Sequence, residues 1–137
     1  MSIKIGINGF GRIGRLNLRA AFGSDELEFV HINEPKAPAK SAAHLLEFDT
    51  VHGRWNHRIT ADEKSITVDG HSINYSSEST PGAVDWAASE VDIVLECSGK
   101  FKTPTLLQPY LDQGIKKVIV AAPVKEGALN VVVGCNN

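Results

Sequence analysis

The stretch Ile7–Phe22, INGFGRIGRLNLRAAF, places three glycines within six residues, after an apolar run and before a helical pattern. Residues 3–8, IKIGIN, alternate and predict a strand that leads into the glycines. Residues 12–22 predict a helix, because apolar side chains recur at helical spacing at Ile13, Leu16 and Ala20. Residues 27–33, LEFVHIN, predict a second strand. A strand, a helix and a strand within about 30 residues indicate a βαβ unit with parallel strands.

The glycines match the spacing of a dinucleotide-binding turn, GFGRIG. Gly9 permits the tight turn out of the strand, Gly11 lets the backbone approach a pyrophosphate, and Gly14 allows the helix and the strand to pack closely. The free N–H groups and the positive end of the helix dipole then face the phosphates. Glu34 follows about 20 residues later, where a carboxylate takes the ribose hydroxyls and repels a 2′-phosphate. The turn therefore predicts NAD as the cofactor, in preference to NADP.

The remaining chain repeats the pattern of strands and helices, with one excursion. The Asp69–Gly70 pair within residues 58–76 is typical of an antiparallel hairpin. The other expected elements are a helix at 39–48, a loop at 49–53, strands at 91–99, 116–123 and 129–136, and a helix at 103–114 capped by Thr103, with Pro104 in its first turn. We expect one domain over residues 1–137, a doubly wound parallel sheet of the Rossmann type with a small antiparallel hairpin insertion.

The composition limits the function classes. The formal net charge of −2 gives no general attraction to nucleic acid, and no apolar stretch approaches the length of a membrane-spanning helix. Two cysteines form no disulfide framework, which favours a reducing cytoplasm. The five histidines lack an HExxH or CxxC partner pattern, so no metal site is expected.

Four blocks in this order resemble glyceraldehyde-3-phosphate dehydrogenases over the whole chain: INGFGRIGR, HLLEFDTVHG, VLECSGKF and KKVIVAAPVKEG. The resemblance implies the amino-terminal NAD-binding domain of that family. Within the family, NEPK, RWNH, QPYLDQGIKKV and PVKEGALNVVVG are most similar to a subtype found beside arsenic-resistance transporters. The resemblance to that subtype implies production of an unstable arseno-phosphoglycerate for export.

The resemblance also implies which residues contact NAD. The pyrophosphate would be wrapped by the turn, namely Asn8, Gly9, Phe10, Gly11, Arg12, Ile13 and Gly14. Asn33 and Glu34 would hold the adenosine side, where the family usually has Asp in place of Glu34. The nicotinamide half would lie beside Cys97, Ser98, Gly99 and Phe101, and the cleft would be closed by Ala121 and Ala122. The chain departs from the family at Ser79, where an Arg near the adenine is common, and at Ala121, where Ser is common.

The family's nucleophilic cysteine lies in an SCTTN-like motif, which this sequence lacks. We therefore expect no catalytic residue here, an inactive cofactor half that needs a separate catalytic domain, and a homotetramer in the full-length family. In that family a thiohemiacetal on the cysteine passes hydride to NAD, and phosphate releases the product. The alternatives are a stand-alone nucleotide-binding module and another Rossmann oxidoreductase, such as an aspartate-semialdehyde-type enzyme; the blocks HLLEFDTVHG and ECSGKF argue against the latter.

Three further side chains invite a catalytic interpretation. Cys97 ends a buried strand with no basic motif beside it, so we expect a cofactor-side role and no nucleophile. Asp92 and Glu96 lie on one face of the strand at 91–99, and we expect an edge and cleft role for them in preference to acid–base chemistry.

Overall fold

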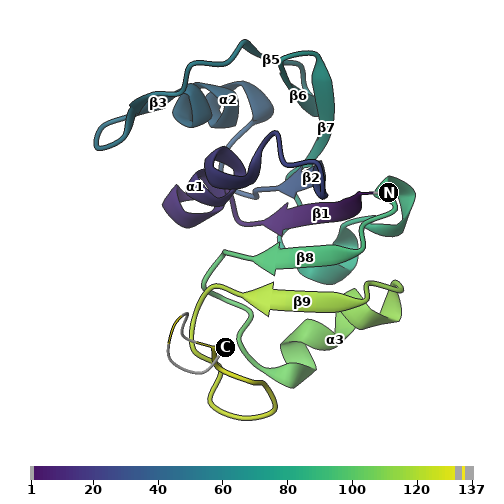
Figure 1. Cartoon of the computed structure of the whole chain (residues 1–137). Coiled ribbons are helices and arrows are strands. Elements are labelled where there is room, and N and C mark those ends of the chain that lie inside the picture. The colour runs from purple at the N-terminus through teal and green to yellow at the C-terminus, as the bar shows by residue number, and fades with distance from the viewer. Residues whose placement is uncertain (1, 132–133, 135–137) are drawn as a thin grey trace.

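The computed structural model describes residues 2–131 and 134. Its first elements are β1 (Ile3–Asn8), α1 (Arg12–Ala21) and β2 (Leu27–Asn33), with β1 and β2 parallel, so the predicted βαβ unit is confirmed. The main sheet has the order β5-β6-β7-β2-β1-β8-β9. Figure 1 shows the arrows of β1, β8 and β9 side by side and pointing the same way.

The predicted hairpin is present and extends the main sheet. Strand β6 (Ser65–Val68) pairs antiparallel with both β5 (Ile59–Ala61) and β7 (His71–Ser76). Asp69 and Gly70 form the turn between β6 and β7, both with positive φ (50° and 84°), which suits a two-residue hairpin. Strand β7 then pairs parallel with β2, so the antiparallel strands join the parallel part of the sheet at β2.

The second half of the chain adds the other edge of the sheet. It contains the 3₁₀ turns η1 (Pro81–Ala83) and η2 (Ala87–Ser89), β8 (Ile93–Glu96), α3 (Pro104–Asp112) and β9 (Lys117–Val120). The predicted cap of α3 is confirmed, because the Thr103 hydroxyl accepts a hydrogen bond from the Leu106 N–H at 3.3 Å. The helix continues through Pro109.

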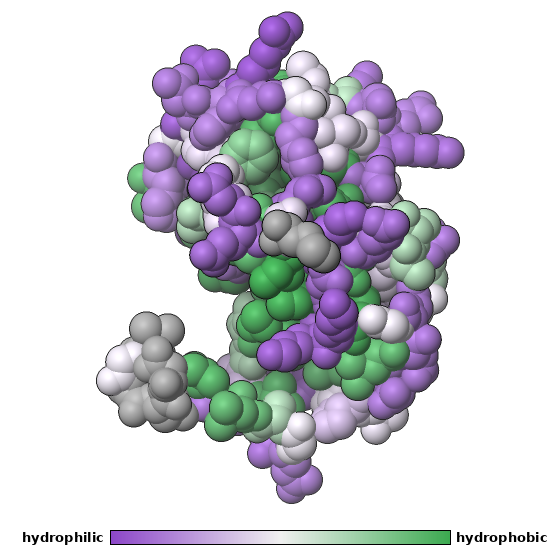
Figure 2. Space-filling view, turned by 45° about the vertical axis from the view of Figure 1, so that its right-hand side comes forward, coloured by the Kyte–Doolittle hydropathy of each residue, from purple (hydrophilic) through white to green (hydrophobic). Residues whose placement is uncertain are grey.

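The prediction of a strand at 129–136 is wrong for residues 129–131, the first part of that range. Residues 129–131 have no strand conformation, and Leu129 is 80% exposed. Residues 132, 133, 135 and 136 lie outside the described residues. Figure 2 shows hydrophobic surface in the lower half of the molecule. Ile119, Leu129 and Val131 are among the large apolar side chains that are exposed. The apolar pattern favours a strand, but a strand also needs a hydrogen-bonded neighbour.

Helices cover both faces of the sheet, which confirms the doubly wound class. One core joins α1, α2 (Ala39–Glu47) and the strands, with Leu18, Leu46 and Ile7 fully buried. The other lies between β8, α3 and the 3₁₀ turns, around Trp86 and Tyr110. Gly6 of β1 faces this second core, because a Cβ there would lie 2.8 Å from the Trp86 ring.

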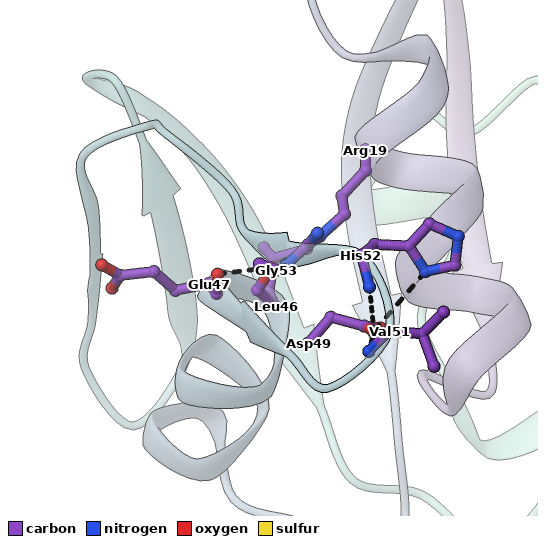
Figure 3. Close-up of polar contacts among 7 residues, drawn as sticks. All are labelled: Arg19, Leu46, Glu47, Asp49, Val51, His52 and Gly53. Carbon is purple, nitrogen blue, oxygen red and sulfur yellow. Dashed lines mark hydrogen bonds and ion pairs between the residues drawn. The ribbon is translucent and has the colours of Figure 1, made fainter.

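The expected loop at 49–53 is instead the tip of a two-stranded sheet formed by β3 (Phe48–Asp49) and β4 (Gly53–Arg54). The Asp49 carboxylate accepts hydrogen bonds from the N–H groups of His52 (2.8 Å) and Val51 (2.7 Å), which lower the pKa of Asp49 to about 2. Arg19 of α1 reaches this segment and donates to backbone carbonyls at the end of α2 and at Gly53 (Figure 3). Side chains therefore stabilise the tight reversal that follows α2.

Candidate functional site

The glycine turn between β1 and α1 is bare because neighbouring backbone occupies two of its three Cβ positions. A Cβ on Gly9, whose φ is +91°, would lie 2.5 Å from the Ser98 nitrogen. A Cβ on Gly14 would lie 2.2 Å from the Gly9 carbonyl oxygen. A Cβ on Gly11 would meet nothing within 4 Å. Gly9 and Gly14 therefore serve packing within the protein, whereas Gly11 faces open space.

The amino-terminal end of α1 faces this open space. Gly11 is the N-cap residue, and within residues 2–131 and 134 no side chain caps it. The first turn carries no acidic residue, so nothing in it offsets the positive end of the helix dipole. Backbone N–H groups without partners at a helix start bind anions well. The turn thus fits a pyrophosphate, because the Cβ position of Gly11 is open.

A cleft of about 230 Å³ lies over the carboxyl ends of the parallel strands, where open α/β sheets bind ligands. Seven of the predicted residues line it: Asn8, Gly9, Gly11, Glu34, Cys97, Ser98 and Phe101. Five further residues complete the wall: Pro35, Lys36, Glu78, Ser79 and Lys100. Two lysines and two glutamates face the same cleft, so its charges are balanced.

Glu34 joins the two sides of the βαβ unit at the cleft. One carboxylate oxygen accepts from the Phe10 N–H at 2.9 Å, and the other accepts from the Lys36 N–H at 2.8 Å. Each oxygen of a carboxylate can accept more than one hydrogen bond, so donors on a ligand can still be bound. The geometry therefore fits a ribose, whose hydroxyls donate, and disfavours a phosphate.

The other eight predicted residues, Ala121 and Ala122 included, are not among the lining residues of the cleft. Phe10 is buried in the core beside α1, and Asn33 is buried at the end of β2. Gly99 follows β8, and Ala121 and Ala122 follow the neighbouring strand β9. The remaining predicted residues, Arg12, Ile13 and Gly14, belong to the first turn of α1.

Residues that the sequence interpretation missed also follow strand ends. Pro35 and Lys36 directly follow Glu34, and Lys100 lies between two predicted residues, so adjacency alone could have indicated them. Glu78 follows β7, and recognising it required knowing that β7 pairs with β2. Asp92 directly precedes β8 and accepts from the Lys4 N–H at 3.0 Å, whereas Glu96 is the last residue of β8, so the two carboxylates lie at opposite ends of the strand.

Cys97 has the character of a structural thiol. The Asn17 amide donates to its sulfur at 3.7 Å, and burial raises the pKa of the Cys97 thiol to about 11. A thiol with a raised pKa stays protonated near neutral pH, and the thiolate is the nucleophile. Cys135 lies outside the described residues.

His31 makes the stability of the domain pH-dependent. It is 7% exposed between the hydroxyls of Ser89 and Ser76, both at 2.8 Å, and burial lowers the pKa of His31 to about 4. Between pH 6.5 and 4 the unfolded chain binds a proton at His31 that the folded chain does not. The stability that neutral His31 contributes to the folded state is therefore complete above pH 6.5 and falls as the pH drops. We expect a loss of about 2 kcal/mol in unfolding free energy between pH 7 and pH 5.

Urea titrations at both pH values measure this loss, with His31→Gln as the comparison. Because Gln does not titrate, the variant should lose less than half as much stability over the same interval. An equal loss in the variant and the wild type would assign the effect to other groups.

Among the residues that the structure describes, no helix is long and apolar enough to cross a membrane, and no group of three or more His, Cys, Asp or Glu side chains could hold a metal ion.

Comparison with known proteins agrees with the geometry of the cleft. Residues 3–104 match the model of the glyceraldehyde 3-phosphate dehydrogenase NAD-binding domain. The chain is 56% identical over 137 residues to glyceraldehyde-3-phosphate dehydrogenase 3 of Nostoc sp., covering 100% of this chain and 41% of that protein. It is 42% identical over 136 residues to glyceraldehyde-3-phosphate dehydrogenase 1 of Giardia intestinalis (99% and 40%) and 43% identical over 134 residues to that of Bacillus cereus (98% and 40%). The chain thus spans about two fifths of the length of these relatives. A glycine turn that leaves space for a pyrophosphate, a carboxylate placed for a ribose and the match over residues 3–104 agree: the chain belongs to the glyceraldehyde 3-phosphate dehydrogenase NAD-binding domain family, and its cofactor is NAD.

Proposed function

We propose that this chain is the cofactor-binding half of a phosphorylating glyceraldehyde-3-phosphate dehydrogenase. The observation that carries the proposal is the open space at Gly11, between the start of α1 and the carboxylate of Glu34. Bound NAD supplies the hydride acceptor of the reaction. The chain's own residues bind and orient it, and they do so at the carboxyl ends of the parallel strands.

Each part of the cofactor is assigned to different residues at the cleft. The pyrophosphate lies along residues 8–14, where the backbone N–H groups of Arg12 and Ile13 donate to it. Asn33 and Glu34 hold the adenosine side. The nicotinamide half lies beside the segment after β8 and is closed by the segment after β9, with the residues Cys97, Ser98, Gly99, Phe101, Ala121 and Ala122. The two lysines at the cleft, Lys36 and Lys100, supply positive charge beside the phosphates.

The chemical step is assigned to residues outside this stretch. The 137 residues lack an SCTTN-like motif, and the raised pKa of the Cys97 thiol makes it a poor nucleophile. In the complete enzyme we propose hydride transfer from a thiohemiacetal on a separate cysteine, phosphate or arsenate as the acceptor, and a homotetramer. The relatives are dehydrogenases by name, which favours this proposal over a stand-alone nucleotide-binding module. Calorimetric titration with NAD should show one site, and an aldehyde substrate should give no turnover with this chain alone.

Replacing Gly11 with Ala separates ligand space from protein packing. Gly11 has φ −75°, which Ala adopts readily, and the added methyl meets no protein atom within 4 Å. We expect unfolding free energy to change by less than about 0.5 kcal/mol. The affinity for NAD should fall about 10-fold or more, because the methyl occupies the space assigned to the pyrophosphate. Calorimetry and urea unfolding measure the two effects, and unchanged affinity would place the pyrophosphate elsewhere.

Glu34 should set the preference for NAD over NADP. A 2′-phosphate beside this carboxylate brings like charges together, which costs enough free energy to make NADP bind about 10-fold more weakly or worse. Glu34→Gln removes the charge and should narrow the ratio of the two dissociation constants to about 3-fold or less. Glu63→Gln makes the same charge change in the exposed turn between β5 and β6 and should leave the ratio as it is. An unchanged ratio in Glu34→Gln would remove Glu34 from cofactor selection.

A further inference from the structure

A row of polar side chains crosses the sheet beneath the cleft. The last residues of the four neighbouring parallel strands β7, β2, β1 and β8 stand in register as Ser76, Asn33, Asn8 and Glu96. We call these four residues the polar row. Hydrogen bonds join them in turn: Ser76 Oγ to Asn33 Oδ1 at 2.7 Å, Asn33 Nδ2 to Asn8 Oδ1 at 2.8 Å, and Asn8 Nδ2 to Glu96 Oε1 at 2.7 Å. Asn33, Asn8 and Glu96 are each at most 3% exposed.

The backbone of Glu78 fixes the direction of the polar row. Its N–H donates to Asn33 Oδ1 at 2.8 Å, and its carbonyl accepts from Asn33 Nδ2 at 2.9 Å. A backbone N–H can only donate and a carbonyl can only accept, so the Asn33 amide has one possible orientation. Asn33 therefore donates to Asn8, and Asn8 in turn must present its own NH₂ group to Glu96.

Glu96 ends the polar row as an acceptor at both oxygens. Its second oxygen accepts from the Ser98 N–H at 2.9 Å and from the Ser98 hydroxyl at 2.5 Å. The Lys100 N–H donates to that same hydroxyl, which leaves the hydroxyl proton for Glu96. The buried Tyr110 hydroxyl also donates to Glu96. One carboxylate thus connects the residue before the glycine turn with the segment after β8; both segments line the cleft, and we call them its two walls.

We propose that Glu96 is a positioning residue for the cofactor. From beneath the cleft, Glu96 holds the glycine turn and the Ser98 segment at a fixed separation. The inference rests on the proposed placement of NAD between these two walls. Gly9 packs directly on the backbone of Ser98, so any change in their separation moves the turn that receives the pyrophosphate. Glu96 contacts the walls and not the ligand: it is 2% exposed and is not among the lining residues of the cleft.

A carboxylate at position 96 is required by the order of donors. Glu96 accepts from two pairs of donors: Asn8 and Tyr110 at one oxygen, and the N–H and hydroxyl of Ser98 at the other. Glu96→Gln keeps the shape of the side chain but points an NH₂ group at one of these pairs. If that group faces Asn8, then Asn8 must turn its amide to accept, and its NH₂ group then meets the NH₂ group of Asn33. Asn33 cannot turn in response, because both of its amide atoms are held by Glu78. If the group faces Ser98 instead, it opposes a backbone N–H that has no alternative.

The first test compares NAD affinity in two variants at the same carboxylate. Glu96→Gln should weaken NAD binding about 10-fold, because a displaced wall misplaces the pyrophosphate contacts. Tyr110→Phe removes one donor to Glu96 and preserves the order of the polar row, so it should lower the melting temperature but change NAD affinity less than about 3-fold. Equal affinity in folded Glu96→Gln and wild type would overturn the inference, as would equal losses in the two variants. Failure of the wild type to bind NAD would instead overturn the proposed function.

The second test needs no cofactor. Asn8→Asp in the Glu96→Gln background moves the carboxylate one step along the polar row, so that the carboxylate now at position 8 accepts from both Asn33 and the new amide at position 96. We expect each single variant to lose about 6–10 °C in Tm and the double variant to recover to within about 3 °C of wild type. Asn8→Asp alone is destabilised because it sets two carboxylates side by side. A double variant less stable than both singles would overturn the inference, and if Glu96→Gln fails to fold, folding of the double variant decides the question.

Discussion

Replacing Gly9 with Ala will lower the free energy of unfolding by about 3 kcal/mol or more. The Cβ would lie 2.5 Å from the nitrogen and 2.6 Å from the Cα of Ser98, and 2.8 Å from the carbonyl carbon of Cys97. All three atoms are backbone, so no side chain can rotate away. The φ of +91° adds strain that any residue other than glycine would feel.

Gly9→Ala should also lower the affinity for NAD, because the methyl pushes apart the two walls that Glu96 joins. Urea unfolding followed by tryptophan fluorescence gives the stability, and calorimetry gives the affinity. Gly11→Ala is the matched control, since it adds the same methyl two residues away into open space. A Gly9→Ala variant as stable as Gly11→Ala would contradict the close approach of the turn to Ser98.

The sequence predicted the elements whose causes are local. The glycine turn, the helix after it and the Asp69–Gly70 hairpin each depend on residues within a few positions of one another. The pairing of β7 with β2 joins segments that are far apart in the chain, His31 with Asn74 for example, and nothing within either segment specifies it. The strand expected from residue 129 fails for the same reason, since alternation indicates which residues favour burial and not which strand they pair with.

The candidate site divides in the same way. Gly9, Gly11 and Glu34 were indicated by spacing, and they line the cleft together. Glu78 was missed because it comes to the cleft only through the non-local contact between β7 and β2. The sequence predicts an edge and cleft role for Glu96, but its function as an acceptor for two cleft walls depends on side chains from α3 and β1. The sequence pattern of one segment does not show which side chains from other elements will contact it.

Arg19→Met should lower the free energy of unfolding by about 3 kcal/mol, although Arg19 is only half-buried. Its guanidinium donates to the Leu46 carbonyl at 2.7 and 3.0 Å, to the Glu47 carbonyl at 3.1 Å and to the Gly53 carbonyl at 3.2 Å (Figure 3). The carbonyls of Leu46 and Glu47 belong to the last turn of α2, which lacks helical partners and carries the negative end of the dipole. Met keeps the aliphatic stem and removes both hydrogen bonds to the Leu46 carbonyl, whereas the Glu47 carbonyl keeps the hydrogen bond from the Trp55 N–H at 2.7 Å.

Arg54→Met is the control for charge and position. Arg54 lies in the same β3–β4 segment and pairs with the Glu47 side chain at 3.1 Å, but it is 64% exposed. An exposed ion pair contributes about 0–1 kcal/mol, so this variant should lose less than about 1 kcal/mol. If urea unfolding gives similar losses for the two variants, then net charge near α2 matters and the carbonyl contacts of Arg19 do not. A loss confined to Arg19→Met shows that a side chain from α1 holds the reversal after α2, so that part of the stability of this segment depends on its contact with α1.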